Sequence, residues 1–227
     1  MATLKVKDYD IIYLSYDEPN AEENYYDLLQ RIPWAKRVHG VEGSDAAHKA
    51  CADLSETDRF ITIDGDNRVV DGFIDEELYF RDDIDLSNCV VSWSGYNIIN
   101  GLTYGNGGIK CWPKELVLNM RTHEHADPSD IQSQVDFCWN LEYLQINKTF
   151  STVHNNATAQ QAWRAGFREG VKMCLLEGLR TTDINRIPKK NLDRLRIWQT
   201  VGSDVDNGLW AIYGAREGAY KTLCTDW

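Results

Sequence analysis

An alternation of three apolar runs with two helix-like segments constrains the fold of this chain more than any other feature. The runs lie at residues 10–16, 34–41 and 60–63 and are rich in β-branched and aromatic side chains, as strands are. The segments between them, 21–31 and 43–54, have the apolar spacing and capping residues of helices. This order predicts an α/β fold with a mostly parallel central sheet flanked by helices, because parallel strands need crossover connections.

The last of the three runs stops at Asp64-Gly65-Asp66. In open α/β sheets, ligands bind beyond the carboxyl ends of the strands, which is where these carboxylates would lie. The triplet alone means little, since Asp-x-Asp occurs four times and the other copies are Asp8/Asp10, Asp83/Asp85 and Asp204/Asp206. The copy at 64–66 stands out because it follows a buried-looking strand, and we expect it to form a metal and diphosphate site.

A second informative stretch, residues 104–113, combines adjacent glycines with aromatic side chains. Glycines let the backbone approach a ligand closely, and aromatic rings offer faces for stacking on a sugar or a base. A hairpin turn with a bulge would use the same glycines, so both interpretations stay open.

The distribution of charge limits the partners that the chain can bind. The formal net charge is −11, which argues against a polyanionic partner. Residues 160–200 depart from this balance with nine basic and four acidic side chains, so this segment carries 9 − 4 = +5 and the rest −11 − 5 = −16. Such a cluster is either a solvated helix face or a local anion-binding surface.

Composition favours a soluble, cytoplasmic protein with one main core. Apolar residues make up 43% of the chain, no apolar run approaches the roughly 18 residues of a membrane span, and the amino terminus lacks the apolar region of a signal peptide. The six scattered cysteines include no Cys-x-x-Cys pair, which indicates reduced core thiols rather than a zinc site. We therefore expect a single domain across 1–227 and no membrane partner.

Residues 43–52, rich in small side chains, precede the strand and the aspartate triplet of 60–67. This combination resembles the GT-A class of nucleotide-sugar glycosyltransferases, in which such a helix precedes the strand that ends in Asp-x-Asp. Residues 15–20, 33–41 and 104–110 resemble glycosyltransferase-like proteins of tailed bacteriophages, some of which modify hydroxymethylated pyrimidines in viral DNA.

The resemblance implies a GT-A-like, Rossmann-like domain with a nucleotide-sugar-binding half at 1–100, an acceptor half at 101–160 and a helical part at 161–227. The donor-binding residues that it implies are Ser15, Tyr16, Asp17, Glu18, His48, Asp64, Gly65 and Asp66. The implied acceptor-binding residues are Tyr104, Asn106, Gly107, Gly108, Lys110 and Trp112. The implied ligands of a Mn or Mg ion are Asp64, Asp66 and His154.

Sugar transfer explains why these residue types are needed. The nucleoside diphosphate leaves with developing negative charge, which a hard divalent ion held by carboxylates stabilises as a Lewis acid. Asp66 is the preferred direct ligand, Asp64 would bind the metal or the ribose, and a UDP-sugar is the favoured donor. An inverting enzyme also needs a general base, for which Asp136 is preferred to Asp127. A retaining enzyme needs no such base, and the sequence leaves the stereochemistry open.

Several functions compete within this framework. Transfer to hydroxymethylated DNA would use the basic residues of 164–196 for phosphate contacts, with Trp112 or Tyr104 stacking on a base. Transfer to a saccharide or small molecule fits the net negative charge better. A nucleotidyltransferase would share the sheet and a metal-binding aspartate, but residues 15–20 are acidic and contain no glycine. A non-catalytic nucleotide- or sugar-binding module would keep the fold without turnover.

Overall fold

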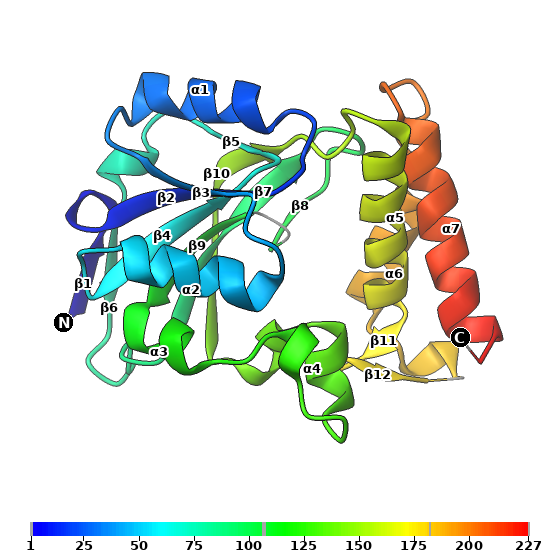
Figure 1. The fold of residues 1–227 in the computed structure, drawn as a ribbon. Helices are drawn as coiled ribbons and strands as arrows, with labels where there is room; N and C mark the ends of the chain where they lie inside the picture. Colours follow the sequence, from blue (N-terminus) through cyan, green and yellow to red (C-terminus); the bar gives the residue numbers. More distant parts are fainter. Residues whose placement is uncertain (1, 106–107, 182, 227) are drawn as a thin grey trace.

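A mixed sheet forms the centre of the molecule (Figure 1). The computed structural model describes residues 2–105, 108–181 and 183–226. The central sheet has the strand order β3-β2-β4-β9-β7-β10-β5, with β8 paired to β7. Its strands are β2 (Asp10–Ser15), β3 (Lys36–His39), β4 (Arg59–Asp64), β5 (Asn67–Val69), β7 (Val90–Asn97), β8 (Thr103–Tyr104), β9 (Ile109–Pro113) and β10 (Tyr143–Val153).

The strands follow the predicted pattern in the first part of the chain and depart from it afterwards. β3, β2 and β4 are parallel neighbours, as the strand–helix alternation predicts. β9 then enters between β4 and β7, antiparallel to both, and β5 is antiparallel to β10. β7 and β10 are again parallel, so the sheet is mixed. The prediction of a mostly parallel sheet is wrong at β9 and β5, which join the sheet without the helical crossover that parallel neighbours need.

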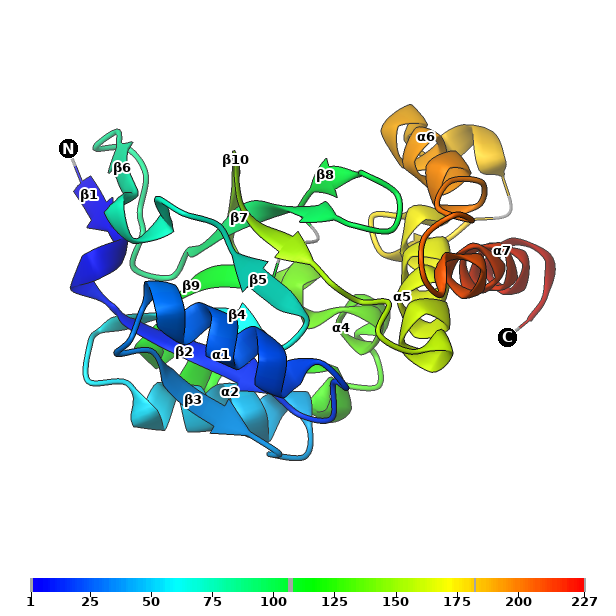
Figure 2. The ribbon, with the colours of Figure 1, turned by 90° about the horizontal axis from the view of Figure 1, so that it is seen from above.

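Helices cover both faces of the sheet, and the alternation of side chains along the strands explains how. Ile11 and Tyr13 point to the face covered by α1 (Ala21–Arg31), where they join a cluster with Leu28. Ile12 points to the other face and packs in a cluster with Cys51 of α2 (Ser44–Leu54) and Val117 of α3 (Lys114–Asn119). Figures 1 and 2 show α1 and α2 on opposite sides of the strands.

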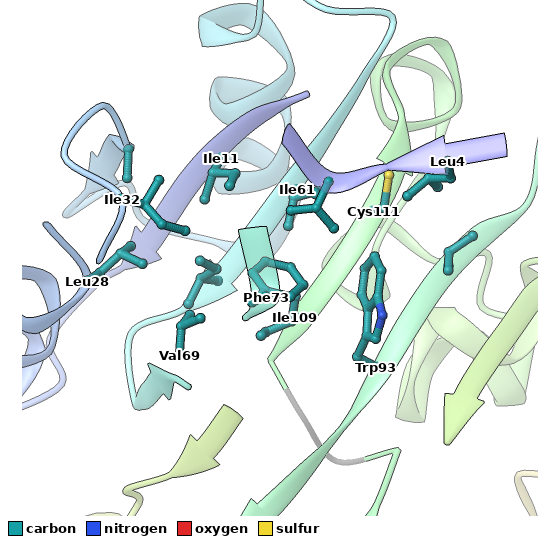
Figure 3. Packing of buried hydrophobic residues seen from close by; sticks show 14 of the residues in the cluster. Leu4, Ile11, Leu28, Ile32, Ile61, Val69, Phe73, Trp93, Ile109 and Cys111 are labelled. Carbon is teal, nitrogen blue, oxygen red and sulfur yellow. The ribbon is translucent and has the colours of Figure 1, made fainter. Parts of the chain in front are cut away.

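The larger cluster continues under β5 and β7 (Figure 3). Trp93 of β7 is fully buried and meets the ring of Phe73 edge-on, with centroids 5.4 Å apart. Phe73 begins the short 3-10 helix Phe73–Asp75, which follows β5. This packing fixes the far half of the sheet against the parallel half that carries the aspartate pair.

Three helices stand beside the sheet (Figures 1 and 2): α5 (Ala159–Met173), α6 (Lys189–Trp198) and α7 (Gly208–Cys224). The face of α5 toward α7 carries glycines: a Cβ on Gly166 would lie 2.0 Å from the Ala211 carbonyl oxygen of α7, and a Cβ on Gly214 would lie 2.1 Å from the Trp163 carbonyl oxygen. The backbones of α5 and α7 are therefore in direct contact.

Smaller elements complete the chain. Among the described residues, no helix combines the length and the apolar character that crossing a bilayer requires. The small elements are β1 (Ala2–Lys5) paired with β6 (Glu77–Phe80), β11 (Leu175–Leu176) paired with β12 (Leu179–Arg180), α4 (Ile131–Val135), and 3-10 turns at Val6–Asp8, Phe73–Asp75, His123–His125, Phe137–Asn140 and Ile184–Arg186.

Candidate functional site

The turn between β4 and β5 carries the predicted aspartate pair. Asp64 is the last residue of β4, and Asp66 follows after Gly65. Two buried side chains hold this turn, because Tyr13 Oη and Asn24 Nδ2 both donate to the Gly65 carbonyl oxygen, at 2.6 and 2.9 Å. The two carboxylates are therefore fixed at the carboxyl ends of the parallel strands, where open α/β sheets bind ligands.

The end of β2 packs against the same turn. A Cβ on Gly65 would lie 2.6 Å from Glu18 Oε2 and 3.0 Å from Ser15 Cβ, so a residue without a side chain is required here. Glu18 Oε2 also accepts the Tyr16 backbone N–H at 2.8 Å. Tyr16 and Asp17 are exposed beside it. The structure thus brings the predicted donor-binding residues of the β2–α1 loop next to the aspartate pair.

Asp66 lies in a strongly negative environment. Burial raises the pKa of its carboxyl to about 6, and the charges of Asp64 and Glu18 add to this increase. A hydrogen bond from Asn67 Nδ2 to Asp66 Oδ1, at 2.7 Å, and the positive charge of Arg168 act in the opposite direction. A site that makes one of its own carboxylates hard to ionise is a site that favours a bound cation.

Strand β9 places a lysine beside this pair. Lys110 Nζ lies 3.6 Å from Asp64 Oδ2, and the lysine side chain is only 17% exposed. Burial acts to lower the pKa of Lys110, but the attraction of Asp64 outweighs it and the pKa is raised. A Cβ on Gly108 would lie 2.5 Å from Asp64 Cβ, and the Gly108 N–H donates to Asn67 Oδ1 at 3.1 Å. The glycine stretch therefore packs its backbone directly onto the aspartate turn.

His48 of α2 lines the other side of Asp64. Its Nδ1 donates to the Ser44 carbonyl oxygen at 2.7 Å, and its ring meets the ring of Trp112 edge-on, at 5.2 Å between centroids. Burial lowers the pKa of His48, while the charges of Asp64 and Lys110 act on it in opposite directions. The imidazole is therefore neutral near pH 7, with Nε2 as an acceptor.

A row of basic side chains on α5 faces the acidic turn. Arg164, Arg168 and Lys172 are spaced by four residues and so lie on one face of the helix, opposite the glycines that contact α7. The charge of Arg168 acts on both Asp66 and Asp136. Lys172 Nζ forms an ion pair with Asp136 Oδ2. Acidic and basic groups thus alternate across the site.

Sequence reasoning missed Arg168 and Lys172 as site residues and treated them only as members of a basic segment. A signal was present in their spacing. Gly166 and Gly170 are also four residues apart, and each precedes Arg168 or Lys172 by two positions. In a helix this spacing places the glycines on the side opposite the two basic residues. A helix that buries its glycines must present its arginine and lysine side chains to the other side.

The two predicted general bases differ in their surroundings. Asp136 joins α4 to the next helical turn, and its Oδ1 accepts the Cys138 N–H at 3.0 Å. Burial acts to raise its pKa, but Lys172 outweighs that and the pKa is lowered. Asp127 is exposed and accepts hydrogen bonds from Ser129, as turn aspartates commonly do. Asp136 belongs to the charged site, whereas no charge of the described site acts on Asp127.

The imidazole of His154, the predicted third metal ligand, points away from the aspartate pair. Its backbone N–H donates to the Asp66 carbonyl oxygen at 2.6 Å, but its Nε2 lies 2.9 Å from Thr152 Oγ1. Burial and the charge of Arg68 lower its pKa, and the acidic groups that act on it are Glu23 and Asp27. Among the described residues, no three His, Cys, Asp or Glu side chains form a metal-binding group.

The two aromatic residues predicted to stack on an acceptor are core residues. Trp112 is 1% exposed and donates from Nε1 to Thr62 Oγ1 at 2.9 Å. Tyr104 is 9% exposed, bonds through its hydroxyl to Glu169, and accepts Trp198 Nε1–H at 2.9 Å. Neither ring has a face open to a base, so their predicted stacking role is wrong. The other two residues predicted in this stretch, Asn106 and Gly107, lie outside the described residues.

The carboxylates present suit a magnesium or manganese ion in part. Mg²⁺ in phosphate-handling sites is commonly held by one or two carboxylates, with phosphate oxygens and water completing its shell. Asp64 and Asp66 supply two such groups, and burial together with the charge of Asp64 raises the pKa of Asp66 to about 6, an effect that a bound cation would offset. His154 does not fit the set, because its imidazole faces Thr152 and Arg68.

Fold and site together define an α/β protein with a two-carboxylate site at the carboxyl ends of its parallel strands. No family model matches the chain, and no curated protein matches it. Among solved structures, the chain is similar to a glycosyltransferase involved in the glycosylation of the major capsid of PBCV-1, with 12% identity and a TM-score of 0.38, over 67% of this chain and 97% of that chain. A likeness at this level defines neither a family nor an activity.

Proposed function

We propose that the protein is a metal-dependent glycosyltransferase of the GT-A type, which transfers a sugar from a nucleotide-sugar donor to a hydroxyl group. The main support for this proposal is that two carboxylates, Asp64 and Asp66, lie at the end of β4 close to two cationic side chains. Lys110 lies beside Asp64, and the charge of Arg168 acts on Asp66. A diphosphate with a divalent ion has both charges, so it complements both halves of such a site.

Each residue then has a task that its position allows. Asp64 and Asp66 hold the Mn or Mg ion, which supplies Lewis-acid stabilisation of the leaving diphosphate. Arg168 lies close enough to Asp66 to alter its pKa, and its guanidinium can donate to the oxygens of the same diphosphate. Lys110 compensates the charge of Asp64. Glu18 and Ser15 border the turn on the side of β2, where they would contact the nucleoside of the donor.

For an inverting reaction, Asp136 is the proposed general base. Lys172 keeps its carboxylate ionised at neutral pH, which is the form that accepts a proton from a hydroxyl group. A nucleotidyltransferase remains the nearest enzymatic alternative, and a binding module without turnover is the non-enzymatic one. The acidic loop of Asp17 and Glu18, which contains no glycine, argues against the nucleotidyltransferase.

The phage resemblance suggests DNA as the acceptor, through basic residues of 164–196. Several of these are engaged inside the protein: Arg180 donates to the Thr222 carbonyl oxygen at 3.2 Å, and Arg194 lies 4.5 Å above the ring of Tyr104. This weakens the case for a continuous phosphate-binding surface. Incubating hydroxymethylated and plain DNA with a panel of nucleotide sugars, followed by mass spectrometry of nucleosides, tests the acceptor; unmodified nucleosides with every donor would rule it out.

The donor site is tested by UDP binding and UDP-sugar hydrolysis with and without Mn²⁺. We expect Mn²⁺ with UDP to raise the melting temperature of the parent protein and not that of Asp66→Asn. Asp204→Asn is the matched control, because it changes one member of another Asp-x-Asp triplet. A parent protein without Mn-dependent stabilisation, or an Asp66→Asn variant that retains it, contradicts the proposed site. Binding without hydrolysis or transfer indicates the binding module.

A further inference from the structure

A polar cavity of about 380 Å³ lies beside the aspartate turn, on the side of α1. Its lining comes from four separate parts of the chain: the first turn of α1, strand β5, the loop before α5 and the loop before α7. The side chains that matter for its chemistry are Asn20, Glu23, Arg68, His154, Asn156 and Asp206. The volume falls at the low end of the range for small-ligand sites, which suits one or two sugar rings.

The cavity has a fixed wall. Asn156 Nδ2 donates to the Asp206 carbonyl oxygen at 2.9 Å, and Asn207 Nδ2 donates back to the Asn156 carbonyl oxygen at 2.9 Å. These reciprocal amide bonds join the loop before α5 to the loop before α7. Asn207 also has a positive φ of 58°, a conformation that asparagine tolerates better than most residues. The cavity is therefore built into the fold rather than left by loose loops.

The charges around the cavity are mixed and nearly balanced. Arg68 pairs with Glu23 at 2.6 Å, so these two charges offset one another. The remaining formal charge is the carboxylate of Asp206, which accepts no hydrogen bond from the described residues. A polyanion would be repelled by this set, and an apolar ligand would leave its polar groups unpaired. A neutral ligand rich in hydroxyl groups fits it.

One lining residue has an unmet hydrogen-bonding requirement. Asn20 Nδ2 donates to the His154 carbonyl oxygen at 2.8 Å, whereas Asn20 Oδ1 is buried without a donor among the described residues. A buried acceptor without a partner is unfavourable, and this one has almost no surface that a ligand can contact. The exposed carboxylate of Asp206 is the acceptor that matches the hydroxyl donors of a sugar.

We propose that this cavity binds a neutral saccharide beside the proposed donor site. The cavity adjoins the donor site through one peptide, because His154 lines it and donates its backbone N–H to the Asp66 carbonyl oxygen at 2.6 Å. A saccharide bound there lies beside the aspartate turn and at the other end of α5 from Lys172, the partner of Asp136. Its role is therefore binding, separate from the acceptor hydroxyl that Asp136 would deprotonate.

Saturation-transfer NMR on the full chain, with the methyl glycosides of glucose, galactose, mannose and N-acetylglucosamine and without metal or nucleotide, tests the cavity. Asp206→Ala removes the free acceptor, and we expect it to weaken binding about tenfold, the effect of losing one hydrogen bond to a charged group. Ala157→Phe fills the cavity without removing a polar side chain, and we expect it to abolish binding. Asp204→Ala, outside the lining, should bind as the parent does.

The two proposals fail separately. Absence of binding by all four glycosides, or equal binding by the parent, Asp206→Ala and Ala157→Phe, overturns the saccharide cavity and leaves the donor site as it was. Loss of Mn-dependent UDP binding with intact, Asp206-dependent glycoside binding overturns the transferase and leaves a saccharide-binding cavity. Asp66→Asn should lose UDP binding and keep glycoside binding, because Asp66 contributes no side chain to the cavity lining.

Discussion

The close contact between α5 and α7 predicts that replacing a contact glycine by alanine lowers the melting temperature. Helix propensity alone would raise it, so the sign of the change distinguishes steric overlap from propensity. A Cβ added at Gly166 would lie 2.0 Å from the Ala211 carbonyl oxygen, and one added at Gly170 would lie 2.4 Å from that of Ala215. Ordinary contact begins at 3.4 Å, so α5 would have to move by 3.4 − 2.0 = 1.4 Å for Gly166→Ala and by 3.4 − 2.4 = 1.0 Å for Gly170→Ala. The atoms in the way are backbone atoms, which cannot rotate aside.

Helix propensity acts in the opposite direction. Alanine in place of glycine inside a helix stabilises it by about 1 kcal/mol. Overpacking of a close contact costs about 1–3 kcal/mol or more, and with backbone as the obstacle we expect the upper part of that range. The net effect of Gly166→Ala is then a loss of about 1–2 kcal/mol, or about 2–8 °C in melting temperature for a chain of this size.

Differential scanning calorimetry of Gly166→Ala, Gly170→Ala and Gln160→Ala measures the order of the effects. Gln160 is exposed on the same helix, so its alanine variant reports propensity alone. We expect Gly166→Ala to be the least stable, then Gly170→Ala, with Gln160→Ala close to the parent. A melting temperature of Gly166→Ala at or above that of the parent refutes the backbone contact, since propensity would then be the only effect.

Three further predictions concern charge. The pKa of Asp66 in the folded protein is about 6, above its ordinary value of 3.8, so the stability of the protein falls as pH rises from 3.8 through 6. We expect Asp66→Asn to raise the melting temperature at pH 8 and to make the melting temperature less dependent on pH. The same variant should abolish Mn-dependent UDP binding. Burial acts to raise the pKa of Glu124, but hydrogen bonds from the Thr122 hydroxyl and from the backbone N–H groups of Ser44 and Asp45 at the start of α2 outweigh it and lower the pKa to about 2. Glu124→Gln should therefore lose about 1 kcal/mol in urea unfolding at pH 7, a difference that vanishes as pH falls from 4.5 towards 2; equal losses at both ends would contradict the assignment. Lys172→Met removes the partner of Asp136, so the acidic limb of the pH–rate profile for transfer should move to higher pH, and an unmoved limb excludes Asp136 as the base.

Local patterns predicted the parallel half of the sheet and the place of the aspartate pair. The alternation of strands and helices over 10–66 predicts that these strands are parallel, and the end of the third run locates Asp64 and Asp66. The entry of β9 between β4 and β7 could not be read in this way, because strand pairing between distant segments leaves no periodic trace in either one. Trp112 failed as a predicted ligand contact for the same reason: its burial depends on that pairing.

The two faces of α5 make the carboxyl-terminal helices part of the site rather than an appendage to it. One face carries Gly166 and Gly170, whose missing side chains let α7 approach to backbone contact. That contact fixes the rotation of α5 about its own axis. Residues two positions after each glycine are rotated by about 200° around the helix and therefore lie on its opposite side. Arg168 and Lys172 occupy that side and act on Asp66 and Asp136. A variant that loosens α7 should therefore weaken Mn-dependent UDP binding without changing any residue that touches the nucleotide, and Gly166→Ala provides that test.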